Sequence, residues 1–313
     1  MKNIYKNSSQ NLVKAKKVLM KNNIIGLPTE TVYGLAGNAY SNISVKKIYK
    51  LKKRPRINPL IIHYYNLRLL KKDAVVSQKF LKLYKKFSPG PLTYILKKRK
   101  NSKISYLANA NLKTIAVRFP KNTVTRKLLR SLKFPLAIPS ANLSSAVSPV
   151  CSNDVLDEFG NKLSFILDGG KCKIGLESTV VNLSKKIQIL RPGAISAKEI
   201  SKILKQKVFF SNKSNKVISP GMIKKHYSPG IPIELNCKKM DDIAACIVFG
   251  KRYKNKKNIF NLSRKGSLEE AARNLYVTLR KIKKKGFKKI KVVKIPKSKL
   301  GIAINDRLKK AAN

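Results

Sequence analysis

Acidic residues are scarce in this 313-residue chain, which has 14 Asp and Glu against 70 Lys and Arg and a formal net charge of +56. Such an excess of positive charge indicates an anionic partner, either nucleic acid or a polyphosphate substrate. The abundance of Lys, Asn, Ile and Tyr is typical of an AT-rich genome, but this bias does not by itself explain so few carboxylates. The hydrophobic fraction of 43% is ordinary for a folded protein, so the charge constrains the partners rather than the fold.

Cysteines and long apolar runs are also few. The four cysteines form no C-x-x-C pair, so their spacing indicates neither a zinc site nor a dense disulfide framework. We interpret them as free thiols in a reducing compartment. The N-terminus lacks the apolar stretch of a signal peptide, and no run approaches the roughly 18 apolar residues of a membrane span. These absences predict a soluble, cytoplasmic protein without a membrane partner.

Strands and helices alternate along the first two thirds of the chain, which predicts an α/β fold. Apolar periodicity predicts helices over 9–22, 43–53 and 80–87, the last ended by the breaker Ser-Pro-Gly-Pro at 88–91. Short apolar runs predict a strand before Pro28 and strands over 60–63, 92–96, 114–119, 136–139, 165–167 and 178–183.

Composition changes near residue 208 and predicts a domain boundary. We assign 1–208 to a first domain, 209–232 to a linker, and 233–313 to a small α/β domain with strands over 245–249 and 291–295. Ser267 begins an S-x-x-E capping box, and the helix that follows carries its core residues at helical spacing: Ala271, Leu275, Leu279 and Ile282. The basic run 280–299 is typical of a solvated face rather than of a binding site.

The first chemical motif, PTETVYGL, begins at Pro28, which ends the preceding strand. Gly34 is expected to let the backbone turn. An extended segment would direct the hydroxyls of Thr29, Thr31 and Tyr33 to one face, where they suit a small polar ligand. The same residues are also ordinary strand formers, so this motif alone leaves both interpretations open.

Five further motifs follow in a fixed order. They are KKRPR with NPL at 52–60, SAN with SP at 140–149, LESTV at 176–180, RPG at 191–193, and SPGM with HYSP at 219–229. Together with PTETVYGL, their order, spacing and identity resemble the threonylcarbamoyl-AMP synthase family in its longer form. The resemblance covers nearly the whole chain. It implies a YrdC-like domain, an open twisted mixed sheet with flanking helices, followed by a smaller Rossmann-like α/β domain.

The resemblance implies the reaction of L-threonine, bicarbonate and ATP to threonylcarbamoyl-AMP and pyrophosphate. This is the first step of tRNA threonylcarbamoyladenosine modification, and a partner transferase completes it. The reaction needs no enzyme nucleophile, and the chain has no G-x-S-x-G motif. It needs cations around phosphates and exclusion of water. Mg²⁺ is expected with ATP, held mostly by phosphates and water, while Glu30 and Glu177 are candidates to orient water or metal.

The resemblance also assigns site residues. The threonine pocket would consist of Thr31, His63, Arg118, the backbone of Ile138, and Ser178, with the Arg118 guanidinium pairing with the substrate carboxylate. The ATP site would consist of Lys52, Arg54, Asn58, Thr114, Ser140, Asn142, Ser148, Arg191, His226 and Tyr227. Lys53 stands where the family usually has Gly and puts the local backbone in doubt. The segment 219–229 resembles an interdomain loop that closes over the site.

Two other functions compete with synthesis. A noncatalytic RNA-binding relative would explain the charge and would contact tRNA or double-stranded RNA, but it would not need the set of Thr31, Arg118 and Ser178, and no aromatic RNP motif is present. A carbamoyl-adenylate-forming enzyme would use carbamoyl phosphate in place of threonine. Its relatives carry zinc-finger or acylphosphatase-like modules, for which this chain has neither the cysteine spacing nor the length.

Overall fold

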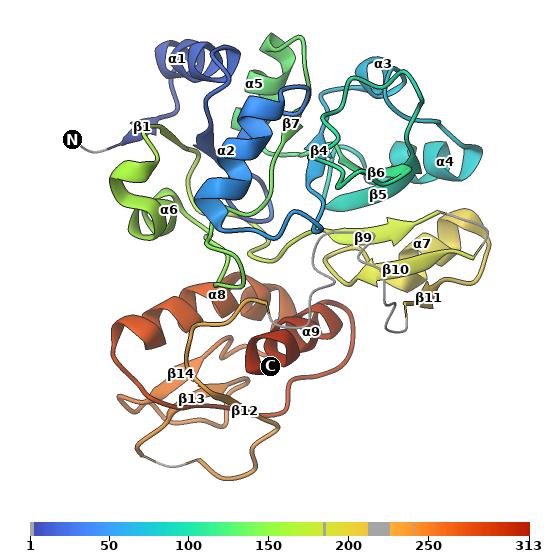
Figure 1. The fold of residues 1–313 in the computed structure, drawn as a ribbon. Helices are drawn as coiled ribbons and strands as arrows, with labels where there is room; N and C mark the ends of the chain where they lie inside the picture. The colour runs from blue at the N-terminus through green and yellow to red at the C-terminus, as the bar shows by residue number, and fades with distance from the viewer. Residues whose placement is uncertain (1–2, 184–185, 212–225, 241) are drawn as a thin grey trace.

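The computed structural model describes residues 3–183, 186–211, 226–240 and 242–313. Eleven of its strands are β1 Ile4–Lys6, β2 Ile25–Leu27, β3 Gly34–Asn38, β4 Ile61–His63, β5 Leu92–Lys97, β6 Thr114–Arg118, β7 Leu136–Ala137, β8 Ile166–Asp168, β9 Thr179–Asn182, β10 Gln188–Arg191 and β11 Phe209–Phe210. They form one sheet in the order β1-β8-β2-β3-β7-β4-β6-β5-β9-β10-β11, with parallel and antiparallel neighbours (Figure 1). The predicted α/β class and mixed sheet are confirmed.

Helices cover this sheet. They are α1 Ser9–Met20, α2 Asn42–Lys52, α3 Leu67–Leu70, α4 Gln78–Phe87, α5 Thr123–Ser131, α6 Ser152–Phe159 and α7 Ala197–Leu204. Most begin at a Ser or Asn whose side chain accepts the backbone N–H three residues later, as at Ser41. α2 ends one residue before the prediction because Lys53 adopts the left-handed conformation, with φ +49°. β7 ends before Pro139, which has no N–H to donate.

The first domain extends past its predicted boundary. β11 pairs in parallel with β10 of the large sheet, so Phe209 and Phe210 are not linker residues. The polar stretch after Ser211 and the SPGM motif fall in 212–225, outside the described residues. The rest of the linker assignment stays a prediction.

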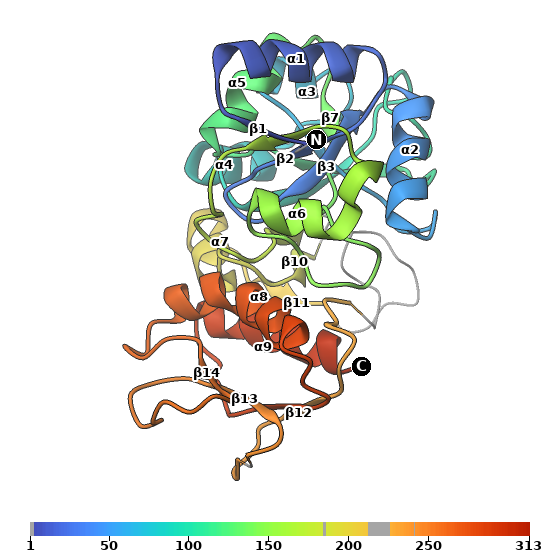
Figure 2. The same ribbon diagram turned by 90° about the vertical axis from the view of Figure 1, so that its left-hand side faces the viewer.

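The second domain is a parallel sheet of β12 Ile233–Leu235, β13 Ala245–Val248, β14 Ile259–Asn261 and β15 Ile290–Val292, in the order β12-β15-β13-β14. Two helices, α8 Leu268–Lys284 and α9 Leu300–Ala312, lie between this sheet and the first domain (Figures 1 and 2). The predicted apolar face of α8 is buried, as expected. The capping box is only half formed, because the Glu270 carboxylate accepts from Ser263 while Ser267 accepts the Glu270 N–H.

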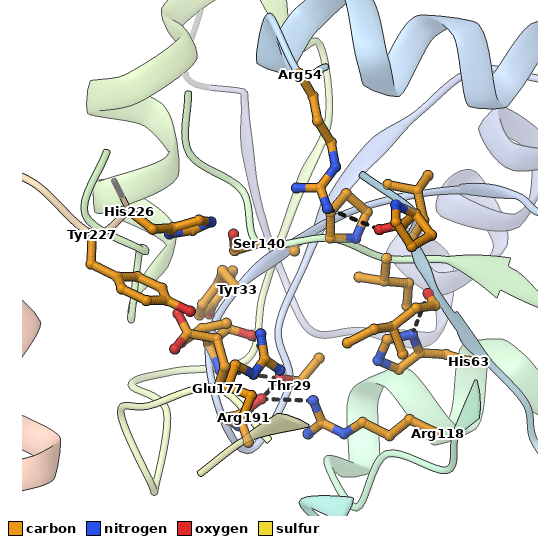
Figure 3. Close-up of a pocket in the computed structure, with 18 residues that line it drawn as sticks. Thr29, Tyr33, Arg54, His63, Arg118, Ser140, Glu177, Arg191, His226 and Tyr227 are labelled. Carbon is orange, nitrogen blue, oxygen red and sulfur yellow. Dashed lines mark hydrogen bonds between the residues drawn. The ribbon is translucent and has the colours of Figure 1, made fainter. Parts of the chain in front are cut away.

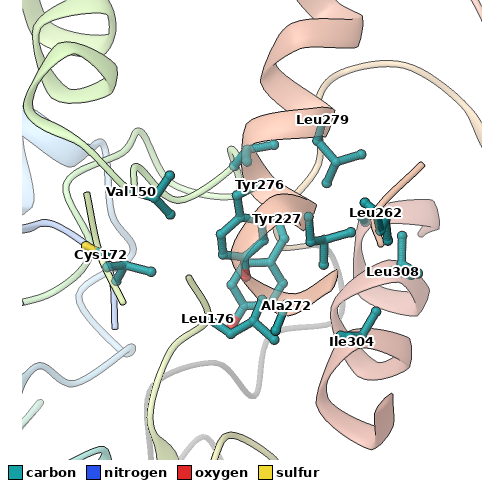
Figure 4. Packing of buried hydrophobic residues seen from close by; sticks show 14 of the residues in the cluster. Val150, Cys172, Leu176, Tyr227, Leu262, Ala272, Tyr276, Leu279, Ile304 and Leu308 are labelled. Carbon is teal, nitrogen blue, oxygen red and sulfur yellow. The ribbon is translucent and has the colours of Figure 1, made fainter. Parts of the chain in front are cut away.

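The two domains share one hydrophobic cluster. Leu176 of the first domain and Tyr227 of the linker pack with Tyr276 of α8 and Ile304 of α9 (Figure 4). Burial of this apolar surface stabilises the contact and holds the helices against the segment that carries the LESTV motif. The predicted solvated run 280–299 also begins in this interface, because Arg280 pairs with Glu158 of α6 at 3.2 Å.

No described helix combines the length and apolar character needed to cross a membrane.

Candidate active site

A cavity lies where the motifs of the first domain meet the HYSP segment that precedes the second domain (Figure 3). The predicted site residues that line it are Thr31, Arg54, His63, Arg118, Ile138, Ser140, Arg191, His226 and Tyr227. Those that do not line it are Lys52, Asn58, Thr114, Asn142, Ser148 and Ser178.

Gly34 is needed for close packing rather than for a turn, which corrects the prediction. It begins β3 with an ordinary negative φ and forms an isolated bridge with Ser140. A Cβ at this position would lie 2.2 Å from Cγ2 of Ile138 and 2.7 Å from the Pro139 carbonyl oxygen. The absence of a Cβ at Gly34 therefore lets the first motif pack against Ile138 and Pro139, which lie between β7 and the SAN motif.

The three hydroxyls of the first motif do not share a face. The Thr29 hydroxyl donates to the Val32 carbonyl at 2.6 Å, which bends the segment out of an extended conformation, and it lies 2.8 Å from the Thr31 hydroxyl. The Tyr33 hydroxyl lies away from this pair, donating to the carbonyl of Gly170 at 2.8 Å. Of the three, Thr31 contacts Arg118 directly, and Thr29 is linked to Arg118 through Thr31.

Arg118 at the end of β6 lines the cavity and is held from behind. Its Nη2 lies 2.7 Å from Oε1 of Glu30, and its Nη1 donates to the Thr31 hydroxyl at 2.9 Å. Glu30 also accepts the Lys121 N–H on Oε2 at 3.0 Å, while Oε1 is ion-paired with Arg118 without forming a hydrogen bond. The pair fixes the guanidinium in one orientation toward the cavity.

His63 is a neutral imidazole with one free nitrogen in the cavity. Burial, and then the nearby charge of Arg118, lower its pKa well below the usual value. Nδ1 lies 3.2 Å from the Ile61 carbonyl oxygen, which can only accept, so Nδ1 carries the proton. Nε2 is buried without a partner and is a hydrogen-bond acceptor.

Arg54 and Arg191 are also oriented by the backbone. Arg54 donates to the carbonyls of Asn58 and Pro59 at 3.0 and 2.9 Å. Burial lowers the pKa of Arg54 to about 10, so the guanidinium remains charged at neutral pH. Arg191 donates to the Ser178 carbonyl and hydroxyl, each at 3.1 Å. Both retain donor capacity for an anion in the cavity.

Lys52 supports the cavity wall from outside. Its ammonium donates to the carbonyls of Ser140 and Asn142, at the loop that carries the SAN motif. Burial and then the charge of Arg54 lower the pKa of Lys52 well below its usual value. The predicted role of Lys52 as a charge on phosphate stays a prediction, and the structure shows it buttressing the loop.

Thr114 begins β6 away from the cavity lining, and its carbonyl accepts from Asn109 at 3.3 Å. Its predicted contact with ATP likewise stays a prediction.

Glu177 lies at the cavity wall inside a complete set of donors. Ser148 donates to Oε1 at 2.6 Å, and two residues of the second domain contact the carboxylate: Tyr276 donates to Oε2 at 2.9 Å, and Arg307 donates to Oε2 at 2.8 Å. Burial opposes its ionisation, but Arg307 and then Arg191 outweigh burial and lower the pKa of Glu177 to about 2. Glu177 is therefore an anion, and sequence analysis did not identify Tyr276 or Arg307.

The HYSP motif closes one side of the cavity. The His226 N–H donates to the carbonyl of Lys310 in α9 at 3.1 Å, and the Ser228 N–H donates to Ser145 at 2.8 Å. Burial lowers the pKa of His226 to about 3, so its ring is neutral. Its Nδ1 and the Tyr227 hydroxyl are buried without partners.

The cavity does not fit a dedicated metal site. Glu30 and Glu177, the two carboxylates considered for this role, are both occupied by protein donors. Within the described ranges, no group of three His, Cys, Asp or Glu side chains could hold a metal ion. The four cysteines are free thiols.

Comparison with known proteins identifies the same family that the sequence motifs resemble, and the matches extend over both domains. A family model described as "Telomere recombination" matches residues 17–193, and one described as "Threonylcarbamoyl-AMP synthase, C-terminal domain" matches residues 195–313. The threonylcarbamoyl-AMP synthases of Pyrococcus abyssi and Bacillus subtilis are each 33% identical. They align over 92% and 96% of this chain and over 90% and 92% of their own lengths.

Solved structures separate the full resemblance from a shared fold. The crystal structure of Pyrococcus abyssi Sua5 in complex with L-threonine has a TM-score of 0.90 at 30% identity and covers 99% of this chain and 96% of that one. Full-length HypF shares the fold alone, with a TM-score of 0.52, 20% identity, and coverage of 58% of this chain and 28% of that one. The chain belongs to the threonylcarbamoyl-AMP synthase family, whose activity is the first step of tRNA threonylcarbamoyladenosine modification.

Proposed function

We propose that the cavity binds L-threonine, bicarbonate and ATP together and joins them as threonylcarbamoyl-AMP, with release of pyrophosphate. Bicarbonate loses hydroxide to give CO₂, and the threonine nitrogen attacks its carbon. The amine proton leaves with that hydroxide as water, and the product is a carbamate. A carbamate oxygen then attacks the α-phosphorus of ATP, and the bond to pyrophosphate breaks. The observation that carries the proposal is one cavity lined by Arg54, Arg118 and Arg191, with no protein nucleophile required.

Arg118 suits the carboxylate of threonine. Its guanidinium is charged, buried and preoriented by Glu30 and Thr31, so binding requires little reorganisation. The free Nε2 of His63 accepts a hydrogen bond from the substrate hydroxyl or nitrogen. Ile138 supplies an apolar wall, and Ser178 holds Arg191 from behind.

The remaining cations suit the phosphates. Arg54 and Arg191 place positive charge where the α-phosphorus and the leaving pyrophosphate gain negative charge. Mg²⁺ would accompany ATP and offset phosphate charge, held by phosphate oxygens and water because the carboxylates of the cavity are engaged. His226 and Tyr227 cover the site and exclude water from the hydrolysable carbamate and anhydride.

The partners follow from the product. Threonylcarbamoyl-AMP must pass to a transferase that acts on tRNA, and the basic surface is proposed to contact tRNA or double-stranded RNA. The free thiols support action in the reducing cytoplasm.

The test is pyrophosphate release from ATP and Mg²⁺ with threonine and bicarbonate each added or omitted. Release that requires both substrates supports the proposal. Release with carbamoyl phosphate in place of threonine would contradict it and favour carbamoyl-adenylate chemistry. Absence of release from folded protein would also contradict it.

A further inference from the structure

The second domain reaches the wall of the catalytic cavity through one buried arginine. Arg307 of α9 does not line the cavity, and its side chain is fully buried. Its Nε lies 2.8 Å from Oε2 of Glu177, which does line the cavity. Tyr276 of α8 donates to the same carboxylate at 2.9 Å. Both contacts cross from the second domain to the LESTV motif of the first.

The same arginine contacts two more parts of the cavity wall. Its Nη2 donates at 2.9 Å to the carbonyl of Pro192, the residue that follows Arg191. Its guanidinium carbon lies 5.1 Å from the centre of the Tyr227 ring, within the range of a cation–π contact. Arg307 therefore joins the LESTV, RPG and HYSP motifs, three segments that are distant in sequence.

The charge of Arg307 has a direct consequence for a nucleotide. Glu177 is a buried anion in a cavity that, under the proposed function, must accept the polyphosphate of ATP. A buried carboxylate without its counterion would repel that substrate strongly, because screening by water is weak there. Arg307 offsets the charge without occupying the cavity.

We propose that Arg307 is a positioning residue of the nucleotide side, and that Tyr276 assists it by fixing the same carboxylate. Arg307 neutralises and orients Glu177, anchors the backbone beside Arg191, and supports the ring of Tyr227. Docking of the second domain thereby completes the ATP site and leaves the threonine side, at Thr31 and Arg118, untouched. This inference rests on the proposed function for the identity of the substrates.

The test is the ratio of two Michaelis constants in Arg307→Met, which keeps the chain length and removes the charge. The KM for ATP should rise by roughly tenfold, the scale on which supporting residues affect a bound group, and the KM for threonine should stay within about twofold. The KM for ATP of Arg307→Lys should lie between those of the wild-type protein and Arg307→Met, because lysine keeps the charge but loses the planar, multiple-donor geometry of the guanidinium. Lys309→Met, an exposed neighbour on α9, is the matched control and should be unchanged.

A double mutant isolates the role of charge. In Arg307→Met the buried carboxylate of Glu177 loses the cation that contacts it, and Asp306 loses its pairing with the same guanidinium, whereas adding Glu177→Gln removes the Glu177 charge. The double variant should therefore bind ATP more tightly than Arg307→Met alone, measured as equilibrium nucleotide affinity by calorimetry. Equal or weaker binding in the double variant would contradict the electrostatic role.

The outcomes separate positioning from folding and from the proposed function. A merely structural role would lower the amount of active enzyme and leave both Michaelis constants unchanged, and that result overturns the inference. If Arg307→Met does not fold, Tyr276→Phe removes a single hydroxyl, and an unchanged KM for ATP in that variant overturns it equally. Failure of the wild-type protein to release pyrophosphate contradicts the proposed function, while nucleotide affinity still tests Arg307.

Discussion

Two buried arginine–glutamate pairs lie at the cavity, and they differ in which member of the pair lines it. In Arg118–Glu30, at 2.7 Å, the arginine lines the cavity and the carboxylate stands behind it. In Arg307–Glu177, at 2.8 Å, the carboxylate lines the cavity and the arginine stands behind it. The first pair lies within one domain, and the second crosses between domains. The first pair presents the positive charge of Arg118 to a substrate. In the second pair, Arg307 offsets the negative charge that Glu177 would otherwise present.

Removing Arg118, the member of the first pair that lines the cavity, should have the largest effect on substrate binding. Arg118→Ala removes the group proposed to hold the threonine carboxylate and leaves Glu30 buried without its counterion. We expect the KM for threonine to rise by about 30-fold or more and the KM for ATP to change little. Initial rates at varied threonine and fixed ATP measure this, and an unchanged threonine dependence would refute the carboxylate role.

Arg54 differs from both arginine–glutamate pairs, because backbone carbonyls rather than a carboxylate hold its guanidinium. Arg54→Ala should raise the Kd for ATP by about 10-fold to 100-fold, because phosphate charge is left unmatched. Calorimetric titration with nucleotide measures the effect. Normal ATP affinity in a folded variant would remove Arg54 from the nucleotide site.

The interdomain pair can be disturbed without touching either member. Gly175 has φ +79°, and a Cβ there would lie 2.6 Å from Cα of Arg273 in α8. Gly175→Ala should destabilise the protein by about 1–3 kcal/mol and raise the KM for ATP more than that for threonine. Gly286→Ala is the matched control, since it has φ +76° and open space around the added methyl group. Equal effects of both variants on the KM for ATP would show that docking is irrelevant to the site.

Acid should lower the stability of the folded protein through two groups on the nucleotide side of the cavity. Burial lowers the pKa of His226 to about 3, below its unfolded value of 6.5, so the unfolded state binds more protons between these values. Stability should therefore fall as pH drops from about 6.5 toward 3, by up to ~1.4 kcal/mol per pH unit. Glu177, whose pKa is about 2 in the folded protein and 4.5 for an unperturbed carboxyl, adds a further loss of stability below pH 4.5.

Urea unfolding midpoints across this range test the prediction, with His226→Asn as the comparison. The variant should show a shallower slope between pH 6.5 and 4.5, and an identical slope would exclude His226 as the source.

The smallest expected effect lies outside both pairs. Lys53 occupies a left-handed position at the end of α2, just before Arg54, with φ +49°. Lys53→Gly should stabilise the protein by about 1 kcal/mol, because glycine adopts this conformation without steric cost. Thermal unfolding measures the gain, and a lower melting temperature would contradict the steric argument. The KM for ATP should stay unchanged.

The sequence predicted the regular elements well because each depends on local pattern. Apolar spacing located the buried face of α8, and Pro28 marked the end of β2. Local pattern was insufficient where contacts decide the role of a residue. Gly34 was assigned to a turn, since a close approach to Ile138 cannot be read from neighbouring residues. The Glu270 carboxylate likewise bonded Ser263 instead of completing its own cap.

Arg307 and Tyr276 were missed because no motif contains them and their partner is 130 and 99 residues away. One signal was present. Leu300, Ala303, Ile304, Leu308 and Ala311 recur at helical spacing, and Arg307 interrupts that apolar face. A buried charge on such a face requires a counterion. The sequence could thus have indicated a partner for Arg307, but not which carboxylate it would be.

The long span of the Glu177–Arg307 pair also affects how the enzyme acquires activity. Contacts between residues 130 positions apart form late, since the entropy of closing so large a loop must first be offset by local structure. The second domain can gain its sheet and helices from contacts within residues 233–313 before it meets the first. Competence to bind nucleotide should therefore lag behind the recovery of secondary structure on refolding, and a chain whose second domain has not yet docked would not present a finished site to ATP.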